Sequence, residues 1–249
     1  MIRILLVRHG ETEWNKEHRL QGRSDIALAD SGVEQARITG SFIRAQNPTQ
    51  GHVSALIRTQ QTFQQFGLDL TPRIWEELME QNLGEWEGLR GAEVRERFPE
   101  EFEGWRAKSY TPAGGESHAE LLERMQRAFF EIVRGTAETQ PTESADLSFP
   151  VRTAVVVSHG AALRVLLEGL GLITRRAFIP LTPAAVTVVD IPLHTGELST
   201  SLPHGGITAD DDAGLIASLT DEQIADRVRL RLINLSPELL NPAATSDAL

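Results

Sequence analysis

Two short apolar segments, each followed closely by a histidine-glycine pair, constrain the fold of this chain most. Isoleucine, leucine and valine fill five of the first seven positions, and His9-Gly10 follows after Arg8. Residues 153–157 form a second apolar segment, which His159-Gly160 follows after one serine. Continuous apolar runs of this length predict strands buried on both faces of a parallel sheet. Because open α/β sheets bind ligands beyond the carboxyl ends of their strands, we expect Arg8 and the two histidines at a ligand crevice.

Further predicted strands and helices alternate along the chain. Apolar residues recur at helical spacing in the segments that we predict as helices, namely from Asp30 or Ser31 to the stop at Asn47-Pro48, 58–66, 116–138, 161–170 and a short helix from Thr220. Further strands are predicted at 52–56, 186–191 and 228–232, the last with one solvated face because leucines alternate with arginines there. The pattern predicts an α/β fold, a three-layer α/β/α sandwich with a mostly parallel central sheet.

The segments between these elements differ in composition. Residues 76–115 are rich in glutamate, tryptophan and glycine and are broken at Phe98-Pro99, which predicts a helical lid inserted into the domain. We predict an exposed loop at 139–150, a polar excursion at 193–214 and a loose C-terminal tail from about residue 237. The remainder is expected to form a single domain spanning 1–249, since a chain of 249 residues can bury one large core.

Composition excludes several classes of function. The chain has no cysteine, which rules out disulfides, thiolate metal sites and a cysteine nucleophile. The net charge of −11 argues against nucleic acid and membrane surfaces as partners, because clustered positive charge drives both kinds of binding. No apolar stretch approaches the roughly 20 residues that span a bilayer. We therefore expect a cytoplasmic protein with a small-molecule substrate and, as one open alternative, a homo-oligomeric state.

The residues after the first strand favour an anionic ligand. Arg8 offers a planar fork of donors, Gly10 allows backbone amides to approach closely, and Thr12 and Asn15 add neutral polar groups. His9 is then the candidate nucleophile. The remaining histidines show no spacing typical of a zinc site, so neither a metal nor a cofactor is expected.

Phosphoryl transfer through a phosphohistidine is the hypothesis that these groups favour. Neighbouring Arg8 and Arg58 would disfavour protonation of His9, and a backbone carbonyl at its other ring nitrogen would set the attacking tautomer. Arg8, Arg58 and His159 would donate to the equatorial oxygens of the transferred group without a metal. The leaving alkoxide needs a proton, and we assign Glu80 as the general acid that later activates water.

A series of motifs resembles the histidine phosphatase superfamily, whose branches include phosphoglycerate mutases. The match runs in order from residue 3 to about 170, and the strand ending near Leu235 resembles the last strand of that family. In chain order the motifs are LVRHGETEWN at residues 6–15, Arg19-x-Gln21-Gly22-x-x-Asp25, Leu28-x-x-Ser31-Gly32-x-x-Gln35-Ala36, Ser54-x-Leu56-x-Arg58-x-x-Gln61-Thr62, Leu78-x-Glu80-x-x-x-Gly84-x-Trp86-Glu87-Gly88 and Val157-Ser158-His159-Gly160.

The resemblance implies a role for each matched position. His9 becomes phosphorylated, and Glu80 falls where the family carries its proton donor. The phosphate-binding set that it implies, with Asn15 and Gln21 also open to a purely turn-forming role, is Arg8, Asn15, Gln21, Gly22, Arg58, His159 and Gly160. The expected enzyme is a metal-independent phosphomonoester hydrolase of the histidine acid phosphatase type.

Departures from the mutase branch favour hydrolysis over mutase chemistry. A resemblance to that branch would imply an aromatic residue before the glycine and paired arginines after the tryptophan-rich segment. At these positions this chain has Leu83 and Arg106-Ala107. Two alternatives stay open: a phosphoglycerate mutase, and a non-catalytic module that binds a phosphorylated ligand. The lid and the loop at 193–214 have no readable code, so the sequence does not name the phosphorylated metabolite.

Overall fold

The central sheet contains six strands in the order β3-β2-β4-β1-β5-β6. The computed structural model describes residues 1–144, 146–174, 180–193 and 209–241. β1 pairs in parallel with β4, β4 with β2 and β2 with β3, whereas β5 pairs antiparallel with β1 and with β6. The predicted mostly parallel sheet is therefore confirmed. The strands are β1 (Ile2–Arg8), β2 (Gln50–Ser54), β3 (Arg73–Trp75), β4 (Arg152–Ser158), β5 (Val186–Ile191) and β6 (Arg229–Leu235).

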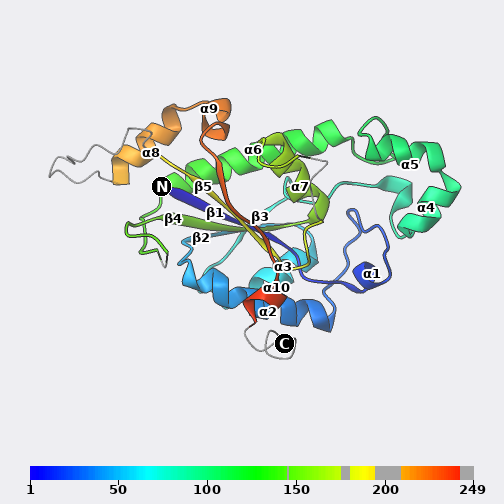
Figure 1. The fold of residues 1–249 in the computed structure, drawn as a ribbon, viewed down its shortest axis with the longest axis horizontal. Coiled ribbons are helices and arrows are strands. Elements are labelled where there is room, and N and C mark those ends of the chain that lie inside the picture. The colour runs from blue at the N-terminus through cyan, green and yellow to red at the C-terminus, as the bar shows by residue number, and fades with distance from the viewer. Residues whose placement is uncertain (145, 175–179, 194–208, 242–249) are drawn as a thin grey trace.

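Helices cover both faces of this sheet, as the predicted three layers require (Figure 1). One face carries α6 (His118–Ala137), α7 (Gly160–Gly169), α8 (Ala209–Ser218) and α9 (Asp221–Ala225). The other carries α2 (Asp30–Ala45), α3 (Ile57–Gln64) and α10 (Pro237–Leu240). Beyond the end of the sheet where β1 finishes lie α1 (Glu13–Lys16), α4 (Gly91–Arg97) and α5 (Pro99–Arg106), with a 3-10 helix, η1 (Gly84–Trp86), in the chain before α4.

Two hydrophobic clusters explain the continuous apolar runs. Alternate residues of β1 point to opposite faces: Ile4 and Leu6 belong to the cluster under α6 and α7, and Leu5 and Val7 to the cluster under α2 and α3. β4 divides in the same way. Because both faces are covered, residues 2–7 of β1 and all residues of β4 are buried, and the period-two alternation disappears. On β6, by contrast, the arginines at 229 and 231 are exposed and the leucines at 230 and 232 half-buried, as predicted.

Three predicted boundaries or segments need correction. β2 ends at Ser54, two residues before the predicted end, because the backbone turns at Ala55-Leu56 and Leu56 already caps α3. Within the predicted polar excursion, residues from Ala209 onward form α8, whose Ile216 joins the main core beside α6. Pro237–Leu240, predicted as part of a loose tail, forms α10 and packs against α2 with Pro237 buried. The rest of the predicted tail, 242–249, and residues 194–208 lie outside the described residues.

The predicted lid region has a hydrophobic cluster of its own. Leu83, Trp86, Val94 and Phe102 are buried together, and Trp86 contacts the rings of neighbouring aromatic residues. Residues 76–115 contain η1, α4 and α5. Within the part of the chain that is described, no helix is long and apolar enough to cross a membrane.

Candidate active site

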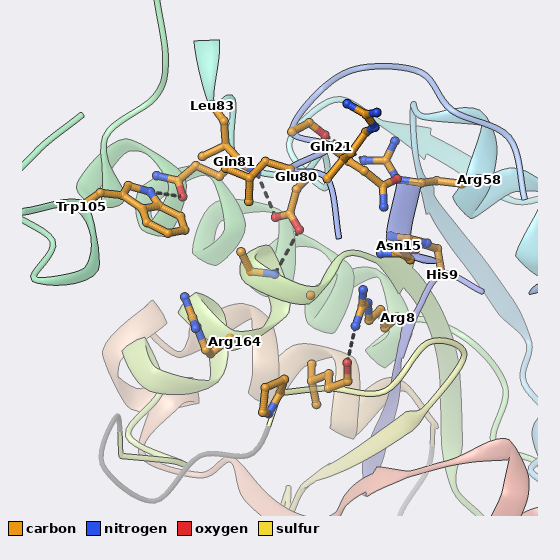
Figure 2. A pocket seen from close by; sticks show the side chains of 17 residues that line it. Arg8, His9, Asn15, Gln21, Arg58, Glu80, Gln81, Leu83, Trp105 and Arg164 are labelled. Carbon is orange, nitrogen blue, oxygen red and sulfur yellow. Dashed lines mark hydrogen bonds between the residues drawn. The ribbon is translucent and has the colours of Figure 1, made fainter. Parts of the chain in front are cut away.

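A cavity of about 270 Å³ opens at the end of the sheet where β1 and β4 finish (Figure 2). Most of the residues predicted for the site line it, although they come from segments far apart in the chain. The lining consists of Arg8, His9, Asn15, Arg19, Leu20, Gln21, Gly22, Arg58, Glu80, Gln81, Leu83, Trp105, Gly160, Ala161, Arg164, Pro180 and Leu181.

His9 lies just after β1 and is almost fully buried. Its Nδ1 is 2.7 Å from the carbonyl oxygen of Gly10, the kind of contact predicted to set the tautomer. If Nδ1–H donates to that carbonyl, the lone pair resides on Nε2. Burial, with Arg58 and Arg8 adding positive charge, holds the pKa of His9 well below its ordinary value. The imidazole is therefore neutral at neutral pH, as a nucleophile must be.

His159, at the start of α7, lies beside His9. The ring centroids are 5.2 Å apart, and His159 is fully buried behind the cavity lining. Its Nδ1 accepts a hydrogen bond from Nε of Arg58 at 3.2 Å, and its Nε2 lies 2.8 Å from Oγ of Ser54. Burial, then the charge of Arg58, lowers the pKa of His159 well below its usual value. His159 is thus a neutral ring that orients the Arg58 guanidinium. The prediction that it donates to the phosphoryl oxygens needs correction, because both of its ring nitrogens contact protein groups and it does not line the cavity.

The two predicted arginines supply the positive charge of the cavity. Arg58, in the first turn of α3, is fully buried and donates to the carbonyl oxygens of Ser24 and Gly22, each at 2.8 Å. Burial lowers its pKa to about 10, so the guanidinium stays charged at neutral pH. Arg8 donates through Nη1 to the carbonyl of Leu181, and its buried Nε has no hydrogen-bond partner among the described residues. That Nε is a donor available to an anionic ligand.

Glu80 enters the cavity from the opposite side. Its Oε2 accepts from the backbone N–H of Ala161 at 3.0 Å, and its Oε1 accepts from the N–H groups of Ala162 and Gln81, each at 2.9 Å. The carboxylate therefore caps the N-terminus of α7, immediately after His159-Gly160. Figure 2 shows it across the cavity from Arg8 and His9.

The turn that carries Glu80 is anchored by Arg124 of α6. This buried guanidinium donates to the carbonyl oxygens of Glu77, Met79 and Glu80 at 2.6–2.9 Å. It also donates to both carboxylate oxygens of Glu116, at 2.6 and 2.7 Å. Arg124 was not predicted as a site residue, because an arginine within an amphipathic helix has no local feature that marks it as buried.

The other predicted ligands reach the cavity in different ways. Oδ1 of Asn15 accepts from the N–H and hydroxyl of Thr12, so Asn15 both caps α1 and lines the cavity. Gln21 is buried with its Oε1 unpartnered among the described residues. Gly22 has a φ of +50°, with the Glu87 carboxylate where a Cβ would lie. Gly160 lies against the guanidinium of Arg8.

Several lining residues were not predicted. Gln81, Ala161, Arg164, Pro180 and Leu181 line the cavity although no motif marked them. For Arg164 a signal exists, because it stands one helical turn after Gly160, on a helix that starts at the site. Among the described residues, no group of three or more histidine, aspartate or glutamate side chains is arranged to hold a metal ion.

The structure is thus an α/β protein in which two neutral histidines and two arginines meet at the carboxyl ends of parallel strands. The chain belongs to the histidine phosphatase superfamily, since the family's branch 1 profile matches residues 4–201. The resemblance in the motifs is thereby confirmed.

Similar proteins include both phosphatases and mutases. Over 171 residues the chain is 29% identical to glucosyl-3-phosphoglycerate phosphatase of Mycobacterium tuberculosis, covering 68% of this chain and 74% of that protein. It is 31% identical to phosphoserine phosphatase 1 of Hydrogenobacter thermophilus (67% and 74% covered) and 36% identical to a probable phosphoglycerate mutase of Yersinia enterocolitica (68% and 75% covered). A structure of mycobacterial glucosyl-3-phosphoglycerate phosphatase in complex with VO3 superposes with a TM-score of 0.74 at 25% identity, covering 95% of this chain and all of that one.

Proposed function

We propose that the protein hydrolyses small phosphate monoesters in two steps through a phosphohistidine at His9. The observation that carries the proposal is the position of His9. A neutral imidazole, with Nδ1 on the Gly10 carbonyl, shares one cavity with Arg8 and Arg58. The phosphatase relatives support hydrolysis as the reaction.

In the first step Nε2 of His9 attacks phosphorus and the bond from phosphorus to the alcohol oxygen breaks. The ring then carries Nδ1–H and a phosphorylated Nε2, and the Gly10 carbonyl stabilises the positive charge that this creates. Arg8 and Arg58 donate to the phosphoryl oxygens, where charge develops in the transition state. No step of this scheme calls for a metal.

Glu80 acts as acid and then as base. It gives a proton to the departing alkoxide in the first step. In the second step its carboxylate takes a proton from water, the water oxygen attacks phosphorus, and the P–N electron pair returns to Nε2. Its position across the cavity from His9 suits an in-line displacement (Figure 2).

Residues 76–115 act in this proposal as the lid that shapes the alcohol side of the cavity. They contribute Glu80, Gln81, Leu83 and Trp105 to its lining. Hydrolysis proceeds when water, rather than a second phosphoglycerate, reaches the phosphohistidine. Leu83 and Ala107 occupy the positions at which a resemblance to the mutase branch would imply an aromatic residue and an arginine. This difference supports hydrolysis.

A phosphoglycerate mutase is the second candidate, favoured by the 36% identity to a probable mutase. The two are separated by priming the protein with 2,3-bisphosphoglycerate and adding 3-phosphoglycerate. A mutase forms 2-phosphoglycerate faster than it releases inorganic phosphate. We expect the reverse order.

The nucleophile is tested by acid quench after mixing with ³²P-labelled substrate. Label should appear on the native protein and be absent from His9→Ala, which should also lose turnover by about 10³-fold or more. His18→Asn is the matched control, because His18 is exposed and its positive φ of 57° suits asparagine. Retained phosphatase activity in His9→Ala would refute the assignment, whereas phosphate binding without label or turnover would indicate a binding module.

Three further expectations concern the metal requirement, the location and the oligomeric state of the protein. Activity of the acid phosphatase type without metal is checked by assays after exhaustive chelation. A cytoplasmic location agrees with the lack of cysteine and is checked by fractionation. Homo-oligomerisation is checked by sedimentation.

A further inference from the structure

A second cavity, of about 300 Å³, adjoins the candidate active site. The two cavities share Gln81, Trp105, Arg164 and Pro180 in their linings. Trp105 donates through its indole N–H to Oε1 of Gln81 at 3.2 Å, so the two residues of segment 76–115 at this boundary are hydrogen-bonded to each other. Arg164 lines it from α7 (Figure 2).

The proposed reaction directs the alcohol part of the substrate toward this boundary. The phosphoryl group lies between His9 and Glu80, with the leaving oxygen on the Glu80 side. Gln81 follows Glu80 directly, and Figure 2 shows Trp105 and Arg164 on the side of the cavity away from His9. An alcohol of several carbons therefore extends from Glu80 past Gln81 and Arg164 into the second cavity.

Positive charge prevails in the lining of the second cavity. Among the described residues, its lining contains Arg164, Arg106 and Lys108 but one carboxylate, that of Glu168. Nζ of Lys108 lies 2.5 Å from Oε2 of Glu168, whereas Nε of Arg164 is 3.9 Å from the other oxygen, beyond hydrogen-bond distance. Glu168 is thus paired mainly with Lys108. Arg106 is likewise paired, with Glu103 at 3.5 Å, so Arg164 has the longest carboxylate contact of the three cations and favours an anionic ligand.

We propose that the second cavity is a subsite for the far end of the substrate's alcohol part, and that Arg164 selects alcohols carrying a negatively charged group there. The inference rests on the proposed phosphatase function. It narrows the substrate class to phosphate monoesters with a carboxylate or a second phosphate several carbons from the scissile ester. Trp105 and Tyr110 supply flat apolar walls for the carbon chain between the two anions.

A pair of substrates that differ in one group tests this. 6-Phosphogluconate and sorbitol 6-phosphate have the same chain length and differ in a carboxylate or a hydroxymethyl group at the far end. We expect kcat/KM to favour 6-phosphogluconate by about tenfold, as one charge-assisted hydrogen bond allows. Arg164→Gln should reduce the ratio of the two values to about one. Arg127→Gln, a change of an exposed arginine on α6 that lines neither cavity, should leave the ratio unchanged.

A second pair locates the anion site. 3-Phosphoglycerate and glycerol 3-phosphate differ in a carboxylate close to the ester, which does not reach the second cavity. A preference in this short pair alone, or a long-pair ratio that Arg164→Gln leaves unchanged, would overturn the proposal.

Failure of the proposed function has a different signature. In that case p-nitrophenyl phosphate and both long substrates release no phosphate. Calorimetry then measures how tightly 6-phosphogluconate and sorbitol 6-phosphate bind to His9→Ala, which tests the proposed subsite independently of turnover. Tighter binding of 6-phosphogluconate that Arg164→Gln abolishes supports the subsite, and equal binding of the two ligands refutes it.

Discussion

Replacing Arg124 with methionine should separate the positioning of Glu80 from the chemistry of the other site residues. The guanidinium of Arg124 makes its contacts with three carbonyl oxygens of the Glu80 turn and with both oxygens of the Glu116 carboxylate. Neither Arg124 nor Glu116 is more than 11% exposed at its side chain. Methionine keeps much of the volume and removes every one of these donors.

The expected cost is large because the partners stay buried. Removing one member of a buried ion pair destabilises a protein by about 3–5 kcal/mol, since the other charge is left without its partner. Arg23 and the N–H of Asn82 still contact Glu116, at 3.3 and 3.4 Å, which places the expected loss near the lower end, about 3 kcal/mol. The double variant Arg124→Met/Glu116→Gln should lose about 1–2 kcal/mol less than the sum of the single changes.

Urea unfolding measures the stability, and paired substrates measure the effect on Glu80. At a temperature where Arg124→Met is folded, kcat/KM should fall more for an alkyl phosphate than for p-nitrophenyl phosphate, whose acidic leaving group needs no proton donor. Arg124→Lys, which restores a cation, should recover part of this difference. Equal losses on the two substrates, or a change in unfolding free energy below about 1 kcal/mol, would refute the reasoning.

Three further predictions concern other contacts. Histidine-selective NMR titration should show the His9 ring still neutral at pH 6, because burial and then the charges of Arg58 and Arg8 lower its pKa; half-protonation near pH 6.5 would contradict this. Burial lowers the pKa of His52 to about 4, so between pH 7 and 5 the unfolded chain takes up a proton that the folded protein does not, and the free energy of unfolding falls. In unfolding experiments over this interval, His52→Asn should lose about 2 kcal/mol less unfolding free energy than the native protein. The Glu87 carboxylate accepts from the N–H groups of residues 23 and 24, so Glu87→Ala should raise the KM for p-nitrophenyl phosphate by about tenfold. Glu85→Ala, a change of an exposed glutamate, is the control. An unchanged KM would show that this loop holds Arg58 without Glu87.

The sequence by itself determined five of the six strands and one half of the site; the edge strand β3 (Arg73–Trp75) was not predicted, because three residues carry no readable periodicity. The apolar runs before His9 and His159 require strands covered on both faces, and because these two strands are parallel neighbours, the residues that follow them lie at the same end of the sheet. Arg58 follows the same rule after β2. These features follow from local patterns, because burial and helix starts are encoded within a few residues of each position.

Only the tertiary structure decided the other half. Glu80 meets the N–H groups of α7 across 81 and 82 positions of chain, and Arg124 reaches the Glu80 turn across 44 to 47. α8 and α10 are helices because they pack on α6 and α2, although their sequences favour a polar loop and a tail. The second cavity likewise forms where α5 and α7 lie close to one another. Contacts of this kind join segments that are distant in the chain. The sequence of one segment does not indicate which other segment it packs against, because packing between distant elements leaves no periodic pattern along the chain.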